Sequence, residues 1–182
     1  HVTLFTEAEA TLLVATRGQL NQDLPAEDKL SYNALLAAIV AHVLAGGYPE
    51  MRQRATLARR QAWGRAYLQA LVERDVRDIA HVERLSQMPH LLAVAAAHCG
   101  QLFNASQIGG QLGLDTKTVD KYLGILEKLF LVQRLPAWSR NELNRLVKTP
   151  KMHFLDAGLQ STLVRLTPEL IVTQRDRWGA TL

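Results

Sequence analysis

The sequence has little capacity for disulfide chemistry and no long hydrophobic run. Cys99 is the only cysteine among the 182 residues, so no disulfide can form within the chain. The most apolar run, residues 34–45, is too short to span a bilayer and contains His42. No stretch has the residue order of a signal peptide. We therefore expect a cytoplasmic protein without a membrane partner.

The motifs of common enzymes and metal proteins are also missing. No glycine-rich loop ends in the Lys-Ser/Thr pair that holds nucleotide phosphates, and no serine lies in a nucleophile elbow. His81, His90, His98 and Cys99 lack the spacing of zinc ligands. We expect this chain to be no enzyme and to hold no metal or cofactor of its own.

The net charge of the chain is small. Lys and Arg number 21 and Asp and Glu number 17, which gives a net charge of +4 and an isoelectric point near 9.5. Such a balance is compatible with a nucleic-acid partner and equally with an ordinary solvated surface. The hydrophobic content of 48% is typical of a globular protein, and the length allows one sizeable core or two small domains.

Residues 104–131 predict two helices joined by a tight turn. Asn104 followed by Gln107 has the spacing of a helix N-terminal cap. We expect Gly109 to be small where the two helices cross, and Gly113 to adopt a positive φ in the turn. The second helix is expected to begin near Thr116, with an apolar face made by Val119, Tyr122, Leu123, Leu126, Leu129 and Phe130.

A small β-hairpin is predicted after these helices. Residues 131–135 alternate as a short strand does, and Pro136 ends it. A polar loop follows over residues 137–147, and residues 151–155 read as the return strand. The order of helix, helix, strand, loop and strand is typical of a winged helix. The alternative is a helical hairpin that only packs.

The first half of the chain predicts helices. One is expected from Ser31 to Leu44, and another over residues 51–83 with an alanine-rich face turned to the core. A further helix is expected from Pro89 to Cys99. The predicted fold class is mainly α: a helical bundle part over residues 1–88, a winged helix-turn-helix with a small β-wing over 89–166, and a tail over 167–182. The outer face of the long helix would carry a basic stripe of Arg52, Arg54, Arg59, Arg60 and Arg65.

The predicted winged helix suggests a surface for duplex DNA, because the first turn of the second helix and the wing would both present cations. Asp120 opposes this hypothesis, since its carboxylate would face the phosphates. We therefore prefer a protein-contact or assembly role, which the low net charge also favours, and keep binding of duplex DNA as the alternative. The candidate DNA-binding residues are Thr116, Lys117, Thr118, Lys121, Arg140, Arg145, Lys148 and Lys151.

An ordered series of short landmarks runs through most of the chain. The landmarks are Gly46-Gly47-Tyr48-Pro49-Glu50, Trp63, Tyr67, Arg74-Asp75, Ile79, Asn104-Ala105-Ser106, Thr118-Val119, Tyr122-Leu123, Leu126-Glu127, Lys148-Thr149-Pro150-Lys151, Phe154, Asp156 and Gly158-Leu159. In this series the chain resembles the C-terminal region, catalogued as domain of unknown function 4143, of predicted ATPases of the AAA+ superfamily. Thr149 and His153 are mild departures, where that family commonly has Ser and Tyr.

The resemblance implies a longer parent protein. Its ATPase core, which would bind ATP and Mg²⁺, would be the first partner of this chain, and residues 1–88 would be a lid-like region. Arg74 would then lie near the nucleotide, although a local pair between Arg74 and Asp78 is the simpler interpretation. On this basis we expect a non-catalytic regulatory or binding region, with the tail leading to a further segment of the parent.

Overall fold

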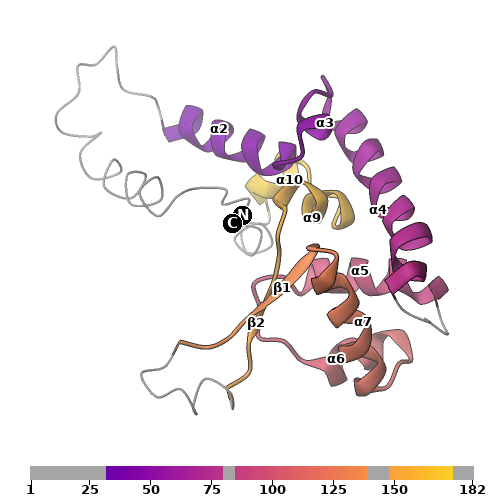
Figure 1. Ribbon diagram of the computed structural model, residues 1–182. Helices are drawn as coiled ribbons and strands as arrows, with labels where there is room; N and C mark the ends of the chain where they lie inside the picture. The colour runs from indigo at the N-terminus through magenta and orange to yellow at the C-terminus, as the bar shows by residue number, and fades with distance from the viewer. Residues whose placement is uncertain (1–31, 80–84, 139–147, 174–182) are drawn as a thin grey trace. The chain divides into compact units, whose positions relative to one another are not determined.

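The computed structural model describes residues 32–79, 85–138 and 148–173 (Figure 1). These residues are mainly helical and include one two-stranded antiparallel sheet. None of the helices in these ranges combines the length and the apolar character that a membrane span requires. The chain divides into two compact units, His1–His42 and Val43–Leu182. The domain boundaries expected at residues 88 and 166 stay predictions.

Nearly all described elements belong to the second unit, and α2 (Tyr32–Ala45) spans the boundary. The other elements are α3 (Pro49–Arg52), α4 (Leu57–Ile79), a 3-10 turn (Leu85–Gln87), α5 (Met88–Ala97), α6 (Ala105–Leu112), α7 (Thr116–Lys128), β1 (Val132–Leu135), β2 (Lys151–Phe154), α9 (Ala157–Leu163) and α10 (Pro168–Thr173).

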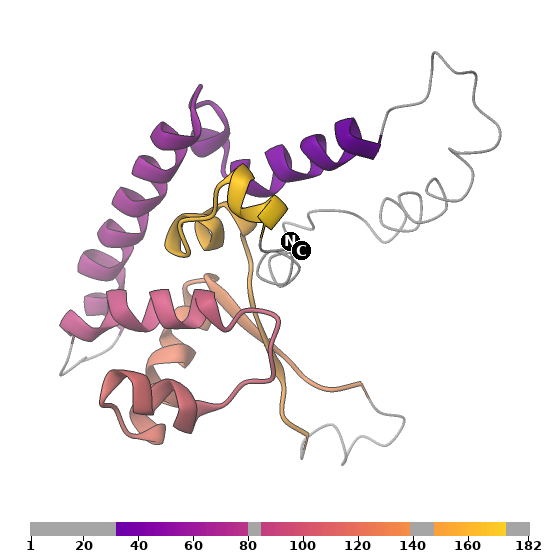
Figure 2. The same cartoon turned by 180° about the vertical axis from the view of Figure 1, so that it is seen from behind.

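The hydrophobic core of the second unit forms around α5. Figure 2 shows α5 between α4 and the pair of α6 and α7, and β2 and α9 also contact it. Burial of one leucine side chain stabilises a fold by roughly 1.5–3 kcal/mol, so this cluster supplies much of the driving force for folding. Its buried members include Leu68, Val72, Val76, Met88, Leu91, Leu92, Ala95, Val119, Leu123 and Leu126.

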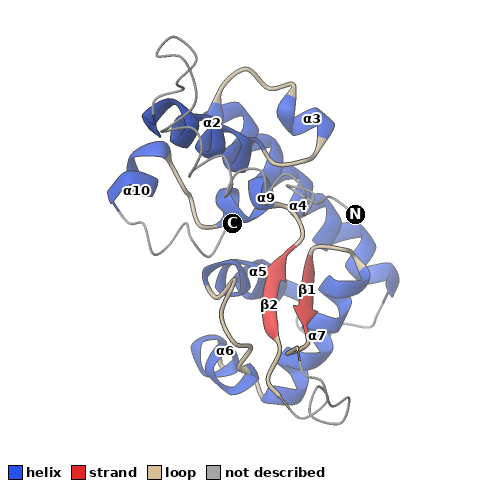
Figure 3. Cartoon of the chain, turned by 90° about the vertical axis from the view of Figure 1, so that its left-hand side faces the viewer, coloured by secondary structure: helices blue, strands red, loops and turns tan. Residues whose placement is uncertain are grey.

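The β-hairpin forms as predicted and is joined by a third extended segment. Figure 3 shows β1 and β2 side by side, and their register pairs Leu135 with Lys151. The backbone of residues 100–103 runs along the other edge of β2: Gly100 N–H donates to the Met152 carbonyl oxygen at 2.7 Å, and Phe103 N–H donates to that of Pro150 at 2.8 Å. β2 is therefore hydrogen-bonded on both sides.

The Asp156 carboxylate bridges two distant segments. Its Oδ1 accepts the Leu159 N–H at 2.7 Å and so caps α9, while its Oδ2 accepts the Gly47 N–H at 2.6 Å. The carboxylate is buried. Gly46 and Gly158 lie against each other beside it, and a Cβ on Gly158 would come within 2.7 Å of the Gly46 Cα. Only glycine fits this contact.

The long helix expected over residues 51–83 is divided at its start. α3 ends at Arg52, and α4 begins only at Leu57. Thr56 explains the new start, because its Oγ1 accepts the Arg59 N–H at 3.3 Å and its carbonyl oxygen accepts the Arg60 N–H. This is the hydrogen bonding of an N-cap. The single-helix prediction was therefore wrong here, and Arg52 and Arg54 do not lie on the same helix as Arg59.

The buried face of α4 also differs from the expected one. The alanines of the predicted face, Ala58, Ala62, Ala66 and Ala70, are exposed, whereas its larger members Trp63, Tyr67 and Leu71 are half-buried against the core. The buried stripe has the same four-residue spacing at a different phase. It begins with a glycine and continues with three apolar side chains larger than alanine, which gain more from burial. Its members are Gly64, Leu68, Val72 and Val76.

The apolar face predicted for the second helix is mostly correct, but it ends earlier. Phe130 lies beyond the end of α7, has a φ of 55° and is 76% exposed. Leu131 N–H donates to the Leu126 carbonyl oxygen at 3.0 Å, as in a helix that ends through a left-handed residue. This reversal into β1 turns the Phe130 side chain outward. Ile125, absent from the predicted face, is buried.

We predict that Asp156→Ala lowers the free energy of unfolding by roughly 2–4 kcal/mol, because α9 loses its cap and the Gly47 N–H loses its buried acceptor. Asp115→Ala is the matched control. Asp115 caps α7 in the same way, but it is exposed and bonds within its own first turn. Urea denaturation of both variants measures the difference. Equal losses would contradict the bridging role of Asp156.

Candidate functional site

A tight turn of residues 113–115 sets the angle between α6 and α7. Gly113 has a φ of 64°, as predicted, and the Leu114 N–H donates to the Gly109 carbonyl oxygen at 2.9 Å. Gly109 is required for a different reason from the expected helix crossing. The first neighbour of a Cβ on Gly109 would be the Leu114 carbonyl oxygen in the turn, and Val119 of α7 comes next at 3.4 Å.

The start of α7 is exposed and carries two cations. Asp115 Oδ1 accepts the Thr118 N–H at 3.0 Å, and the Thr118 hydroxyl donates to Asp115 Oδ2 at 2.6 Å. Both bonds lower the pKa of Asp115, and the bond from the Thr118 hydroxyl has the larger effect. Thr116, Lys117 and Lys121 are exposed. The predicted contact residues of the helix therefore lie together, although the Thr118 hydroxyl is already engaged in the cap.

Arg134 of β1 joins the strand to α7. Its guanidinium bonds to Glu127 at 2.7 Å and to Asp120 at 2.8 Å, and it lies over the Phe103 ring at 5.3 Å from the centroid. The Arg134 hydrogen bond is the main cause of a lowered pKa of Glu127, and it raises the pKa of Arg134. The acid that opposed DNA contact, Asp120, is thus held by a cation of the adjacent strand.

Sequence reasoning missed this network, because Arg134 was taken only as part of a short strand. The available signal was weak. Asp120 and Glu127 are seven residues apart, which places both acids on one face of α7. The arginine that meets them comes from the strand that follows, so the pairing depends on how the chain turns at Phe130.

The hairpin supplies a second group of cations. Lys148 precedes β2 and is exposed, and Lys151 is exposed in the strand itself. Burial lowers the pKa of His153, and the positive charge of the nearby Lys151 lowers it further. This imidazole is therefore neutral at physiological pH. Arg140 and Arg145 lie outside the described residues. The structure therefore places Lys148 and Lys151 on the hairpin but does not place the two arginines of the expected wing.

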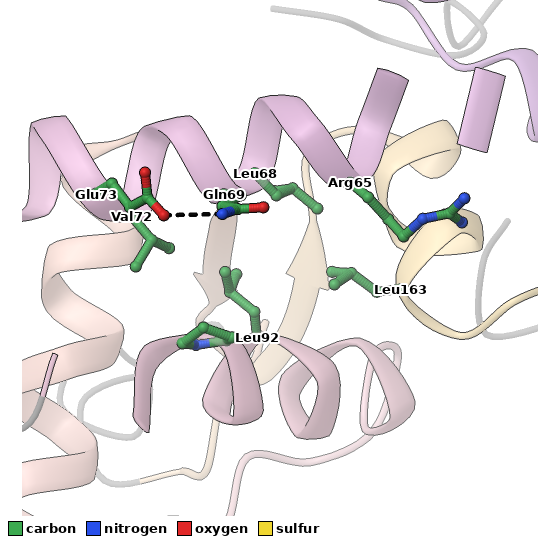
Figure 4. A pocket seen from close by; sticks show the side chains of 8 residues that line it. Arg65, Leu68, Gln69, Val72, Glu73, Leu92 and Leu163 are labelled. Carbon is green, nitrogen blue, oxygen red and sulfur yellow. Dashed lines mark hydrogen bonds between the residues drawn. The ribbon is translucent and has the colours of Figure 1, made fainter. Parts of the chain in front are cut away.

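A separate pocket of about 340 Å³ lies between α4, α5 and α9 (Figure 4). Its walls are mainly apolar. Glu73 accepts a hydrogen bond from Gln69 at 2.8 Å, and Arg65 lies near the α9 end. Arg65 stands apart from the hydrogen-bonded pair of Gln69 and Glu73, so the polar groups do not converge on one point. Its lining residues are Arg65, Leu68, Gln69, Val72, Glu73, Pro89, Leu92 and Leu163.

Metal-ligating residues do not gather within the described ranges: no three His, Cys, Asp or Glu side chains are placed to hold an ion. Cys99 is a buried residue of the core, and its Sγ accepts the Phe154 N–H at 3.3 Å. Burial raises the pKa of the Cys99 thiol, which keeps it protonated and unreactive.

Comparison with known proteins assigns this mainly helical chain to a family. The family described as a domain of unknown function (DUF8612) matches residues 36–170, and the chain belongs to it. Two curated proteins are similar to the chain at 26% identity over 137 residues: the uncharacterized proteins Mb2031c of Mycobacterium bovis and Rv2008c of Mycobacterium tuberculosis. The match covers 75% of this chain and 31% of each relative's length. No solved structure matches it significantly.

This assignment corrects the resemblance to domain of unknown function 4143. The matching family is a different one, and neither relative connects the chain with an AAA+ ATPase. Several landmarks, among them Gly47 and Asp156, meet in the structure and serve packing rather than nucleotide chemistry. The resemblance was the basis for expecting an ATPase core with bound ATP and Mg²⁺. It was also the basis for placing Arg74 near a nucleotide. Neither expectation is supported any longer. Arg74 is exposed on α4, and the side chain of Asp78 lies outside the described ones.

Two adjacent glycines of α6 test the geometry of the turn. Gly109→Ala is expected to destabilise the fold by roughly 1–3 kcal/mol, because its methyl group would collide with the turn backbone. Gly110→Ala meets nothing within 4 Å and is expected to stabilise the helix by about 0.5–1 kcal/mol. Thermal unfolding of both variants gives the sign of each effect. A neutral Gly109→Ala would show that the turn is not tightly packed.

The Arg134 network is expected to weaken in acid. The pKa of Glu127 is lower in the folded protein than in the unfolded chain. Glu127 therefore contributes its full stabilisation above the pKa that it has in the unfolded chain. This stabilisation is lost as the pH falls through the pKa that Glu127 has in the folded protein. After screening, we expect Glu127→Gln to cost about 1 kcal/mol at neutral pH. Chemical denaturation of both proteins across a pH series should show this difference shrinking toward pH 3. A difference independent of pH would contradict the ion pair.

Proposed function

We propose that α5, α6, α7 and the β-hairpin form a winged helix-turn-helix that binds duplex DNA. The order of helix, extended segment, helix, helix, strand and strand supports this, because residues 100–103 pair with β2 as a third strand. The tight turn at Gly113 supports it as well. On this proposal α7 is the helix that enters the major groove.

The observation that carries the proposal is the exposure of two lysines at the start of α7. Lys117 in the first turn and Lys121 in the second are exposed, and Val119 between them is buried against the core. The core therefore holds the turn rigidly while the lysine side chains face outward. Lys148 and Lys151 of the hairpin add cations, and cations that neutralise phosphates release counterions.

The main objection from the sequence is reduced. Asp120 lies between Lys117 and Lys121 in the sequence, but its carboxylate pairs with Arg134 at 2.8 Å. The guanidinium offsets the carboxylate charge at short range, so the field at the α7 surface is less negative than the sequence suggests. Glu127 is held by the same arginine.

A protein-contact role remains the second candidate, and one surface favours it. Leu135 and Leu102 both pair with Lys151, so the three side chains share the outer face of the sheet. Leu102 is 63% exposed, and Trp138 just beyond β1 is 77% exposed. Exposed apolar side chains around one cation are compatible with a protein partner.

The experiment that tests the proposal is fluorescence anisotropy with labelled duplex DNA across a salt series. We expect wild-type affinity to fall steeply with salt. Lys117→Ala/Lys121→Ala is expected to weaken binding and to reduce the slope of log K against log salt by about 2, one unit for each lost phosphate contact.

A double variant with the same change of net charge serves as the control. Lys128→Ala/Arg74→Ala removes two exposed cations, one at the far end of α7 and one on α4. It should bind nearly as the wild type does. Absence of binding at low salt, or equal losses in both double variants, would contradict a DNA contact through α7 and would favour the outer face of the hairpin as a protein-contact surface.

A further inference from the structure

An open hollow of about 500 Å³ lies where α3 leads into α4. It is at the end of the second unit away from α6 and α7 (Figure 1). One duplex lying on the first turn of α7 would therefore leave the hollow free. We refer to it as the arginine hollow, and its lining residues are Gln53, Arg54, Ala55, Arg59, Ala62 and Trp63.

The two cations of the arginine hollow are exposed arginines. Among the described residues, neither Arg54 nor Arg59 has an ion-pair partner, and both are exposed. The backbone around them is fixed: the Arg59 N–H donates to the Thr56 hydroxyl oxygen, and the Arg60 guanidinium donates to the Arg54 carbonyl oxygen at 2.9 Å. The backbone that carries the two arginines is thus hydrogen-bonded at this corner.

Trp63 lines the arginine hollow and belongs to an aromatic cluster. Trp63 stacks on Tyr67 with ring centroids 5.0 Å apart and planes 8° apart, and Tyr48 packs against both rings. Burial raises the pKa of Tyr48, which keeps its hydroxyl neutral. Tyr48 and Tyr67 therefore hold Trp63 in place, and Trp63 gives the arginine hollow one apolar, uncharged surface. An apolar side chain can pack there beside groups that pair with the arginines.

We propose that the arginine hollow binds an acidic segment of a partner protein, with two carboxylates on Arg54 and Arg59 and an apolar side chain against Trp63. Guanidinium groups match carboxylates in a two-pronged geometry, and arginine with tryptophan is the composition of protein-binding hot spots. The volume exceeds what one small anion needs, so several residues of an extended segment fit. The site is independent of the α7 surface.

The test uses a fluorescein-labelled glutamate-rich peptide with a central leucine, and the same peptide with glutamine in place of glutamate. We expect the full chain to bind the first peptide and not the second. Arg54→Gln/Arg59→Gln is expected to weaken binding by about tenfold, which is the effect of losing hot-spot contacts. Arg65→Gln/Arg74→Gln makes the same change of net charge elsewhere on α4 and should change binding by less than about twofold.

Three results would overturn the proposal. The first is no binding of the acidic peptide at low salt, and the second is equal loss in the two double variants, which would indicate unspecific attraction. The third is tighter binding of a single-stranded oligonucleotide that also depends on Arg54 and Arg59, since it would assign the hollow to nucleic acid. Circular dichroism melting of each variant checks that both doubles remain folded.

Discussion

The buried carboxylate of Asp156 joins segments that are 109 residues apart, and much of the second unit depends on that connection. One oxygen caps α9 directly after β2 ends, and the other holds the Gly47 N–H just before α3. The carboxylate therefore fixes the end of the hairpin and the start of the α3–α4 corner at once. Its burial makes the arrangement specific, because any movement that leaves the Gly47 N–H without an acceptor costs free energy.

A second interaction, at Arg134, orders the other end of the unit. The guanidinium takes two carboxylates of α7 and lies over Phe103, so it ties the hairpin to the helix and to the segment before α6. The same contact changes the charge that α7 presents. One guanidinium offsets one of the two carboxylate charges, so this network keeps a net charge of −1 beside the exposed Lys117 and Lys121. Each of the two proposed surfaces thus depends on the charged side chains at one end of the unit: the lysines of α7 at one end and the arginine hollow at the other.

Local signals allowed much of this fold to be predicted from the sequence. The Asn104 cap, the left-handed Gly113 and both strands are where neighbouring residues placed them, because each depends on contacts within a few positions. The buried face of α4 could not be read in this way, since alanines and larger side chains recur at the same spacing and only packing chooses between them. The contacts of Arg134 and Asp156 were missed because their partners are set by the turns between them. The landmark series suggested a family that the comparisons do not support.

Two-dimensional ¹H–¹⁵N NMR of the labelled chain during titration with duplex DNA tests the central claim most directly, because it locates the contact residue by residue. We expect the largest shifts at the amides of Thr116 to Lys121 and around Lys148 and Lys151. The amides of Gly47 and Leu159, which Asp156 holds, should remain unchanged. Shifts confined to the α3–α4 corner, or none at all, would contradict a DNA contact through α7.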